Sequence, residues 1–423
     1  MRILVRNGLI LDPDINLQEI GDLWIENGKV VCIKTASISE GEIPAEEEEL
    51  TIDAQGKWVV PGLIDLHVHF RDPGFEYKED IFTGCQAAAR GGFTTVCCMP
   101  NTKPVIDCPE VVKYIDEKVE KANGVNVLAV GSITQGQKGE TLADINGMAE
   151  LLTRSTKVVG KGICAVSEDG RSVMNAKLML EGILEAKENG LMVFSHTEDD
   201  SLAGTKIGEE LIVARDIMLA KEAKAPIHLC HISTKGSLDI IRQAKTEGVH
   251  VTAETGPHYF VFDQSCVNDD GNKKMNPPLR DQEDVEAVID ALKDGTLDVI
   301  ATDHAPHSSE EKDHGYEKAM NGVVGLETSF AVSYTMLVKN GILTPLELID
   351  KMSCKPAEIL GADRGTLAVG KTADLAIIDI DKEYEIKAED FLSKSKNSPF
   401  LGLKVFGKVE YTIVNGQIVY AAH

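Results

Sequence analysis

Short apolar stretches alternate with segments of helical periodicity through the middle of the chain. Eight such stretches can be read between residues 59 and 301, and they are Val59–Asp65, Thr94–Met99, Asn126–Val130, Ile163–Val166, Met192–Ser195, Ile227–Cys230, Val249–Ala253 and Val299–Ala301. Strands that alternate with helices are typical of a parallel sheet, because parallel neighbours need a long crossover connection. Eight strand–helix units predict an α/β fold whose sheet closes into a (β/α)8 barrel. The alternative is an open doubly wound sheet, which usually carries a glycine-rich loop after its first strand, whereas this chain has His67-Val68-His69 there.

Both ends of the chain have a different pattern, in which short β-like stretches are separated by turn signals. The pairs Asn7-Gly8, Asn27-Gly28 and Asn415-Gly416 predict hairpins. The stretches around them are Ile3–Arg6, Gly8–Leu11, Asp22–Glu26 and Lys29–Lys34 at one end, and Ala373–Asp379, Val405–Gly407, Val409–Val414 and Gln417–Tyr420 at the other. We therefore predict one small composite β-domain formed by residues 1–54 and 361–423, with the barrel in residues 55–360. Two unrelated β-extensions are the alternative.

The composition of the chain limits which binding partners and which cellular compartment we expect. A formal net charge of −25 argues against nucleic acid or an anionic membrane as the main partner. The N-terminal residues are too polar for a secretory signal, and the sequence has no apolar run long enough for a transmembrane helix. The 9 cysteines form no Cys-x-x-Cys pair and several lie in apolar stretches, so we expect buried free thiols in a cytoplasmic protein and no thiolate zinc site.

Polar residues gather where the predicted strands end, which is where barrels of this class place their functional groups. His67 and His69 follow the first strand with i, i+2 spacing, so both side chains lie on one face of an extended segment. Two such imidazoles suit a chelated transition metal, although two histidines in the core or at its rim would have the same spacing. Further polar groups follow later strands and converge on the same cavity; they include Asn101, Asp169, His196, His231, Glu254, Asp303 and His307.

The number of these ligands suits two metal ions. Imidazole and carboxylate are the groups that zinc and similar divalent ions bind in proteins. His67 and His69 would serve one ion and His196 and His231 the other, while Asp169 and Asp303 supply carboxylates, one of which can bridge. Two ions roughly 3.5–4 Å apart can share a hydroxide and polarise a carbonyl group.

Longer motifs resemble the amidohydrolase superfamily and, within it, the class I dihydroorotases. The resemblance covers nearly the whole chain, through Pro61-Gly62-Leu63-Ile64-Asp65, Arg71-Asp72-Pro73-Gly74-Phe75-Glu76-Tyr77-Lys78-Glu79, Met99-Pro100-Asn101-Thr102, Ser195-His196-Thr197-Glu198-Asp199, His231-Ile232-Ser233-Thr234, Met275-Asn276-Pro277-Pro278-Leu279-Arg280 and Thr302-Asp303-His304-Ala305-Pro306-His307. His-x-His is shared across the superfamily. The His-x-Arg that ends in Arg71, together with Asn101 and Asn276, is typical of dihydroorotases.

The resemblance implies an enzyme with about two zinc ions per subunit that interconverts N-carbamoyl-L-aspartate and (S)-dihydroorotate in de novo pyrimidine biosynthesis. The implied metal ligands are His67, His69, Asp169, His196, His231 and Asp303. Asp169 would bridge the ions from the turn Glu168-Asp169-Gly170, where relatives have Asp-Asp-Gly; a carboxylated Lys161 is the other candidate. A metal-bridged hydroxide would attack the ring carbonyl, and Asp303 would act as general base and then as general acid. An aspartate that only binds metal is the alternative for Asp303.

The resemblance also implies a set of substrate-binding residues, namely His69, Arg71, Asn101, Asn276, His307, Asn321 and Gly322. The guanidinium of Arg71 can hold a carboxylate through two hydrogen bonds, although it could instead form a surface ion pair with Asp72 or Glu76. Asn101 and Asn276 suit a ring with carbonyl and N–H groups, but either could be a turn residue, and His307 could simply cap its loop. The polar segment 308–320 could close over the substrate.

Some features and alternatives stay open. Relatives have Pro-Phe-Gly where this chain has Met320-Asn321-Gly322, so the ring-binding side departs from the family. We expect His258 behind the ligands, His304 to point away from Asp303, and His228 in the core.

Three other functions are alternatives. A hydantoinase or allantoinase would have a bridging lysine and no arginine at position 71, an inactive scaffold would lose metal ligands, and a mononuclear deaminase would not need Asp169. A homodimer and association with aspartate transcarbamoylase are expected from the resemblance alone.

Overall fold

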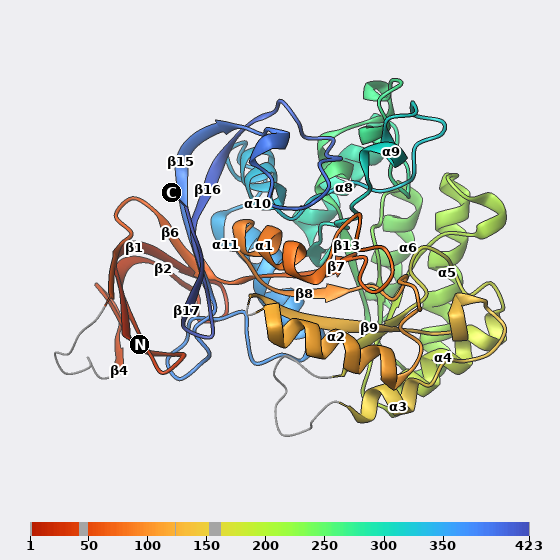
Figure 1. Ribbon diagram of the computed structural model, residues 1–423, viewed down its shortest axis with the longest axis horizontal. Helices are drawn as coiled ribbons and strands as arrows, with labels where there is room; N and C mark the ends of the chain where they lie inside the picture. Colours follow the sequence, from red (N-terminus) through yellow and green to blue (C-terminus); the bar gives the residue numbers. More distant parts are fainter. Residues whose placement is uncertain (1, 42–49, 123, 152–161, 423) are drawn as a thin grey trace.

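The strands of the protein form two sheets. The computed structural model describes residues 2–41, 50–122, 124–151 and 162–422. An eight-stranded parallel sheet surrounded by helices forms the larger body, and a nine-stranded sheet lies at one end of it (Figure 1). This confirms the predicted α/β fold class with a sheet drawn from both termini. Among the described residues, no helix has the length and apolar character needed to span a membrane.

The parallel sheet runs in chain order, so that each strand pairs with the next strand in the sequence. Its strands are β7 (Leu63–Val68), β8 (Phe93–Cys98), β9 (Asn126–Ser132), β10 (Ile163–Ser167), β11 (Val193–Ser195), β12 (Ile227–Leu229), β13 (Val251–Thr255) and β14 (Val299–Ile300). Val68 of β7 bridges to His304 after β14, and the His69 amide donates to the His304 carbonyl at 2.8 Å. These contacts bring the first and last strands together and nearly close the barrel.

Helices cover the outside of the barrel (Figure 1). The longer ones are α1 (Ile81–Arg90), α2 (Pro109–Ala122), α3 (Ile145–Glu150), α4 (Ala176–Glu188), α5 (Lys206–Ala223), α6 (Lys235–Thr246) and α8 (Gln282–Asp294), and the chain then adds α10 (Ser329–Ser333), α11 (Pro345–Ile349) and α12 (Lys355–Leu360). Side-chain caps explain where several begin: Asp80 forms a capping box with Thr83 at α1, and Asp281 accepts two backbone N–H groups at α8. Two short helices, α7 (Pro257–Val261) and α9 (Ser309–Lys312), lie in the loops after β13 and β14.

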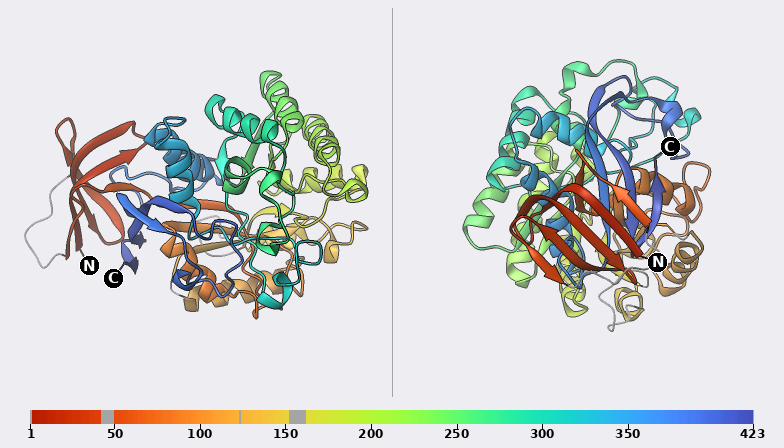
Figure 2. Two further views of the ribbon diagram at one scale, coloured as in Figure 1. Left: turned by 90° about the horizontal axis from the view of Figure 1, so that it is seen from above. Right: turned by 90° about the vertical axis from the view of Figure 1, so that its left-hand side faces the viewer.

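The second sheet combines strands from both ends of the chain (Figure 2). The N-terminal strands are β1 (Arg2–Asp12), β2 (Leu17–Glu26), β3 (Lys29–Thr35), β4 (Ser39–Gly41), β5 (Leu50–Asp53) and β6 (Trp58–Pro61), and the C-terminal ones are β15 (Leu375–Glu385), β16 (Lys404–Val414) and β17 (Gln417–Ala421). The two groups join where β6 pairs with both β1 and β15. Ile3, Leu23 and Leu375 share one buried cluster on this sheet. The prediction of one composite sheet is therefore confirmed, and two separate β-extensions are excluded.

Two local predictions differ from the structure. Asn7-Gly8 does not form a hairpin: it makes a bulge inside β1, because the register with β2 shifts between Val5 and Gly8. Asn27-Gly28 and Asn415-Gly416 do connect antiparallel strands, with positive φ at each of these residues. The predicted strand Val59–Asp65 is divided at Gly62 between the two sheets, as β6 and β7. An added Cβ at Gly62 would lie 2.2 Å from Thr94 Oγ1, so only glycine fits this crossing.

Candidate active site

A cavity of about 400 Å³ opens at the C-terminal ends of the barrel strands. The residues that line it include His69, Arg71, Asn101, Asp169, His196, His231, Asn276, Asp303, His307, Asn321 and Gly322. Every predicted site residue except His67 therefore lines one cavity, and His67 lies buried against Asp169. Lys161, the alternative bridging residue, lies outside the described residues.

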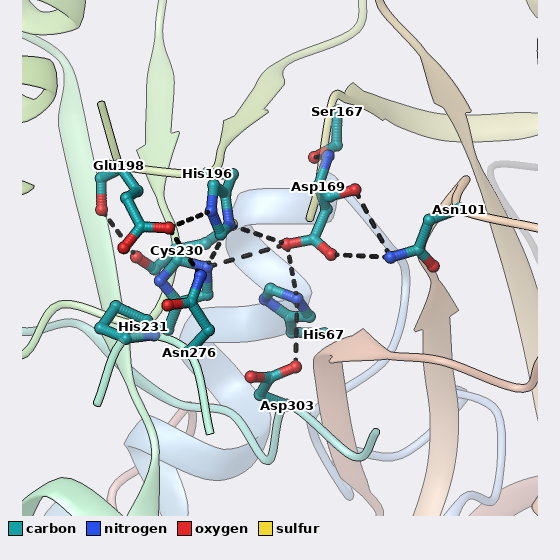
Figure 3. A network of polar contacts seen from close by, with 12 residues as sticks. His67, Asn101, Ser167, Asp169, His196, Glu198, Cys230, His231, Asn276 and Asp303 are labelled. Carbon is teal, nitrogen blue, oxygen red and sulfur yellow. Dashed lines mark hydrogen bonds and ion pairs between the residues drawn. The ribbon is translucent and has the colours of Figure 1, made fainter. Parts of the chain in front are cut away.

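Four histidines and two aspartates converge at the floor of this cavity. Figure 3 shows three of the histidines, His67, His196 and His231, around the two aspartates. Asp169 Oδ1 is 3.1 Å from His67 Nε2, 3.4 Å from His196 Nδ1 and 3.7 Å from His231 Nε2. Asp303 Oδ1 lies 3.1 Å from His69 Nε2 and 3.5 Å from His67 Nε2. Asp169 is thus central to the cluster and in reach of histidines from β7, β11 and β12, which is the position that a bridging carboxylate needs.

The second ring nitrogen of two of these histidines is held by another side chain. His67 Nδ1 lies 2.7 Å from Glu254 Oε1, and His69 Nδ1 lies 2.9 Å from Asn101 Oδ1. Glu254 and Asn101 each accept a hydrogen bond from Nδ1–H, so the Nε2 atom of each neutral ring directs its lone pair at the cluster. Asn101 also donates to Asp169 Oδ2 at 3.3 Å, so its amide joins two predicted ligands.

The charges of the cluster favour a bound cation. Burial raises the pKa of Asp169, but His67, His196 and His231 outweigh it and hold the pKa well below its usual range. Burial likewise raises the pKa of Asp303 while His67 and His69 lower it, and the net pKa is below the ordinary value. The buried His67 Nε2 lies within ion-pair distance of both carboxylates without forming a well-aligned hydrogen bond to either of them. Two ionised carboxylates surrounded by imidazole nitrogens form a donor set that fits zinc or a similar divalent ion.

A second group of residues makes one wall of the cavity positive. Arg71 is half-buried and lies beside His307: its Nη2 lies 3.3 Å from His307 Nε2, and its Nε donates to the Pro306 carbonyl at 3.2 Å. Lys78 lies 3.4 Å from His307 Nδ1. Among the described residues, no ion pair joins Arg71 to Asp72 or Glu76, so Arg71 does not have the alternative role of a surface ion pair. Asp72 pairs with Lys118 instead. This wall can receive a carboxylate.

A second part of the cavity lining, the ring-binding wall, carries amide and backbone groups. Asn276 donates from Nδ2 to Glu198 Oε2 at 2.6 Å, which fixes its orientation. The Gly322 amide donates to the Lys274 carbonyl at 3.0 Å, and the Gly322 carbonyl accepts from Lys312 and Asn397. Because both backbone groups of Gly322 are engaged, a backbone contact with a ligand falls to Asn321.

Several residues that matter at this site were not predicted. The sequence places Glu254 at a strand end but does not predict that it holds His67. Lys78 and Glu198 belong to the motifs shared with the dihydroorotases, but the sequence predicts no role for them. His228 is buried and bonded to Thr252 and Glu254, which confirms a core position. His304 accepts from the Gly325 amide and does not line the cavity, so it turns away as expected. His258 is buried, and neither ring nitrogen has a partner among the described residues; burial lowers its pKa to about 4.

Comparison with known proteins connects this geometry to a family. Residues 58–419 match the amidohydrolase family. The dihydroorotase of Geobacter metallireducens is 49% identical over 99% of this chain and 100% of that protein, and that of Geotalea daltonii is 48% identical over 99% of each. Among solved structures, an L-hydantoinase (dihydropyrimidinase) from Arthrobacter aurescens superposes with a TM-score of 0.86 at 26% identity, over 99% of this chain and 96% of that chain. A dihydropyrimidinase from Brevibacillus agri has a TM-score of 0.84 at 23% identity, over 100% and 95%, which shows the shared fold alone.

Proposed function

The chain belongs to the amidohydrolase family and, within it, to the dihydroorotases, and from this premise we propose how its cavity interconverts N-carbamoyl-L-aspartate and (S)-dihydroorotate in pyrimidine biosynthesis. The observation that carries the proposal is the half-buried Arg71 in the same cavity as the cluster around Asp169. A cyclic amide that also bears a carboxylate would use both the cluster around Asp169 and the guanidinium of Arg71. A neutral hydantoin ring would leave Arg71 without a partner.

We propose two zinc ions as the cofactors. His67, His69 and Asp303 would hold one ion, His196 and His231 the other, and Asp169 would contact both. When bound, such ions supply an activated water molecule and polarise the carbonyl group of the amide. The support is the donor set, in which Glu254 and Asn101 orient His67 and His69 so that their Nε2 atoms face the carboxylates.

Asp303 is the proposed proton carrier. Its carboxylate is ionised at neutral pH because His67 and His69 lower its pKa, and it borders the cavity. In the hydrolytic direction Asp303 accepts a proton from the attacking water and then gives it to the ring nitrogen that leaves as the C–N bond breaks. In the cyclising direction the carboxylate of Asp303 takes the proton from the attacking nitrogen and gives it to the oxygen that leaves the acyl carbon as water when the C–N bond forms.

The two walls of the cavity orient the substrate. Arg71 and His307 would bind its carboxylate, with Lys78 adding positive charge beside them. Asn276, His69 and Asn101 surround the ring, and Asn321 offers its backbone groups to it. The loss of Pro-Phe-Gly at Met320–Gly322 changes side chains on this wall, while the backbone contact from Asn321 stays available.

The experiment that tests this function compares cyclic amides on the purified, metal-analysed protein. We expect turnover of dihydroorotate, none of hydantoin or allantoin, and about two zinc ions per chain. Asp303→Asn should keep the metal and lower kcat by roughly 10²–10⁴, the usual contribution of a general acid–base. Turnover of hydantoin instead would sink the substrate assignment, and bound metal without any turnover would favour an inactive scaffold.

The remaining proposals concern organisation. We propose a cytoplasmic location, which the 9 free cysteines support because such thiols persist in a reducing compartment. The domain limits proposed are residues 1–54 with 361–423 and residues 55–360, although β6 pairs within the terminal sheet. The family resemblance supports a homodimer and association with aspartate transcarbamoylase; sedimentation of the protein alone and with the transcarbamoylase tests both.

A further inference from the structure

The one-turn helix α9 carries two adjacent side chains that bond to different walls of the substrate cavity. We propose that Lys312 is a positioning residue for the ring-binding wall and that Glu311 is a positioning residue for the carboxylate-binding wall. The inference rests on the proposed function, since it assigns ring and carboxylate to these walls. Neither residue takes part in the mechanism described above.

Lys312 is a buried ammonium group that joins three backbone carbonyls. Its side chain is on a residue only 3% exposed. Nζ donates to the carbonyls of Met320 at 2.8 Å, Gly322 at 2.9 Å and Lys274 at 3.1 Å. Three donors on Nζ therefore meet three acceptors, which satisfies the group completely.

The charge of Lys312 is not explained by an ion pair. Among the described residues, no carboxylate lies within ion-pair distance of its Nζ, which donates to backbone carbonyls instead. Burying an unpaired charge costs free energy, and an apolar side chain of the same length would avoid that cost. A lysine at this place is therefore best explained by the three carbonyls that it holds together.

The three carbonyls belong to the two segments that form the ring-binding wall. Met320 and Gly322 flank Asn321, and Lys274 lies two residues before Asn276. The Gly322 amide also donates to the Lys274 carbonyl at 3.0 Å, so the segments are tied from both sides. Gly322 has φ +135, and an added Cβ there would lie 2.8 Å from the Ala305 carbonyl oxygen, so its backbone has no room to shift. Lys312 thus sets the distance between Asn321 and Asn276.

Glu311 does the same for the positive wall. Its carboxylate lies 2.9 Å from Lys78 Nζ and 3.1 Å from His307 Nδ1, and it accepts from the Tyr77 hydroxyl at 2.9 Å. The contact at Nδ1 holds the His307 ring with its Nε2 toward Arg71, 3.3 Å from Nη2. Glu311 also keeps Lys78 beside the Arg71 guanidinium, where two like charges would otherwise move apart.

Positioning through other groups predicts a particular kinetic signature. Among the described residues, the hydrogen bonds and ion pairs of Lys312 and Glu311 do not reach the histidine–aspartate cluster or Asp303. A loosened wall weakens binding of the ground state and of the transition state alike. Such a loss appears in KM, while kcat is largely kept.

The test is steady-state kinetics of the metal-loaded full chain with Lys312→Met, which keeps the length of the side chain and removes its donors. We expect KM for dihydroorotate to rise about tenfold while kcat stays within about threefold of wild type. Lys318→Met is the matched control, because Lys318 is an exposed lysine of the same segment, and it should leave KM unchanged. Lys312→Arg restores charge and donors and should recover part of the affinity.

Two results would overturn the proposal. An unchanged KM with a lower melting temperature would make Lys312 a purely structural residue, and a fall in kcat alone would place it in the chemistry. If Lys312→Met does not fold, Glu311→Gln decides instead, because it should raise KM without lowering kcat; an unchanged KM there counts against the proposal. If the wild-type protein does not turn over dihydroorotate, the proposed function fails and this inference fails with it. If the wild-type protein does turn it over and the variants leave KM unchanged, only this inference fails.

Discussion

At the scale of single residues, the histidines proposed to bind metal are oriented by partners that lie far away in the sequence. His67 and Glu254 are 187 positions apart, and His69 and Asn101 are 32 apart. Burial raises the pKa of Glu254, but His228 and His67 outweigh it and keep it below its ordinary value, so Glu254 carries a charge that a bound cation would feel through the His67 ring.

Glu254→Gln tests this role. Glutamine keeps the shape and can still accept from His67, but it removes the charge. We expect metal affinity to fall about 10–100-fold, as is usual when the partner of a ligating histidine is lost, and competition with a zinc chelator measures it. Glu283→Gln, on an exposed residue of α8 paired with Lys235, should leave the affinity unchanged. Equal chelator midpoints for Glu254→Gln and wild type would contradict the assignment.

The sequence predicts ligands better than it predicts their partners. His67, Asp169 and Asp303 stand directly after strands, and barrel topology brings strand ends together, so their convergence follows from position alone. Glu254 also ends a strand, but its contact with His67 depends on which way each side chain turns. Lys312 gave no signal, because its acceptors are backbone carbonyls and a sequence does not show where these lie.

At the scale of elements, α9 links pH to substrate binding. Burial lowers the pKa of Lys312 to about 8, with Lys274 acting in the same direction and Asp270 and Glu311 opposing it. Above that pH two protons on Nζ serve three carbonyls, so KM for dihydroorotate should rise. Lys312→Met should show a raised KM with no such step, and a step that persists in this variant would assign it to another group.

The ionisation of Lys312 also affects the stability of the fold. A rise in pH that weakens substrate binding increases the contribution of Lys312 to the free energy of unfolding. An unfolded lysine keeps its proton up to about pH 10.5, whereas Lys312 in the folded chain keeps it only up to about 8. Between these values the unfolded chain binds more protons, so the contribution of Lys312 to the free energy of unfolding rises with pH. Melting curves of wild type and Lys312→Met over this range would show the difference.

Element boundaries were the part of the fold that local pattern predicted least well. Asn7-Gly8 carries the signal of a hairpin, yet β1 continues through it as a bulge because β2 pairs with both halves. The run from Val59 looks like one strand, but Gly62 lets the chain pass from the terminal sheet into the barrel. In both cases the partners of the strand decide, and these are not visible in a window of the sequence.

At the scale of the whole molecule, the alternation of strands and helices was sufficient to predict the architecture. The eight predicted stretches correspond to the eight strands of the parallel sheet, and the β-like ends meet in one sheet. Against a net charge of −25, the half-buried Arg71 and the buried Lys78 make a local positive site beside the histidine–aspartate cluster. A protein with this overall charge repels anions at long range, so the selection of an anionic substrate has to occur inside the cavity.

The central claim is therefore that Arg71 selects a cyclic amide by its carboxylate. The most direct measurement compares kcat/KM for dihydroorotate and for 5,6-dihydrouracil, which differs from it only by lacking the carboxylate, in wild type and in Arg71→Met. We predict that wild type strongly prefers dihydroorotate and that Arg71→Met loses this preference by about 10²-fold or more, because a buried charge-assisted pair is removed, while zinc content is unchanged. Equal kcat/KM for the two rings in wild type, or an undiminished preference in Arg71→Met, would contradict the account.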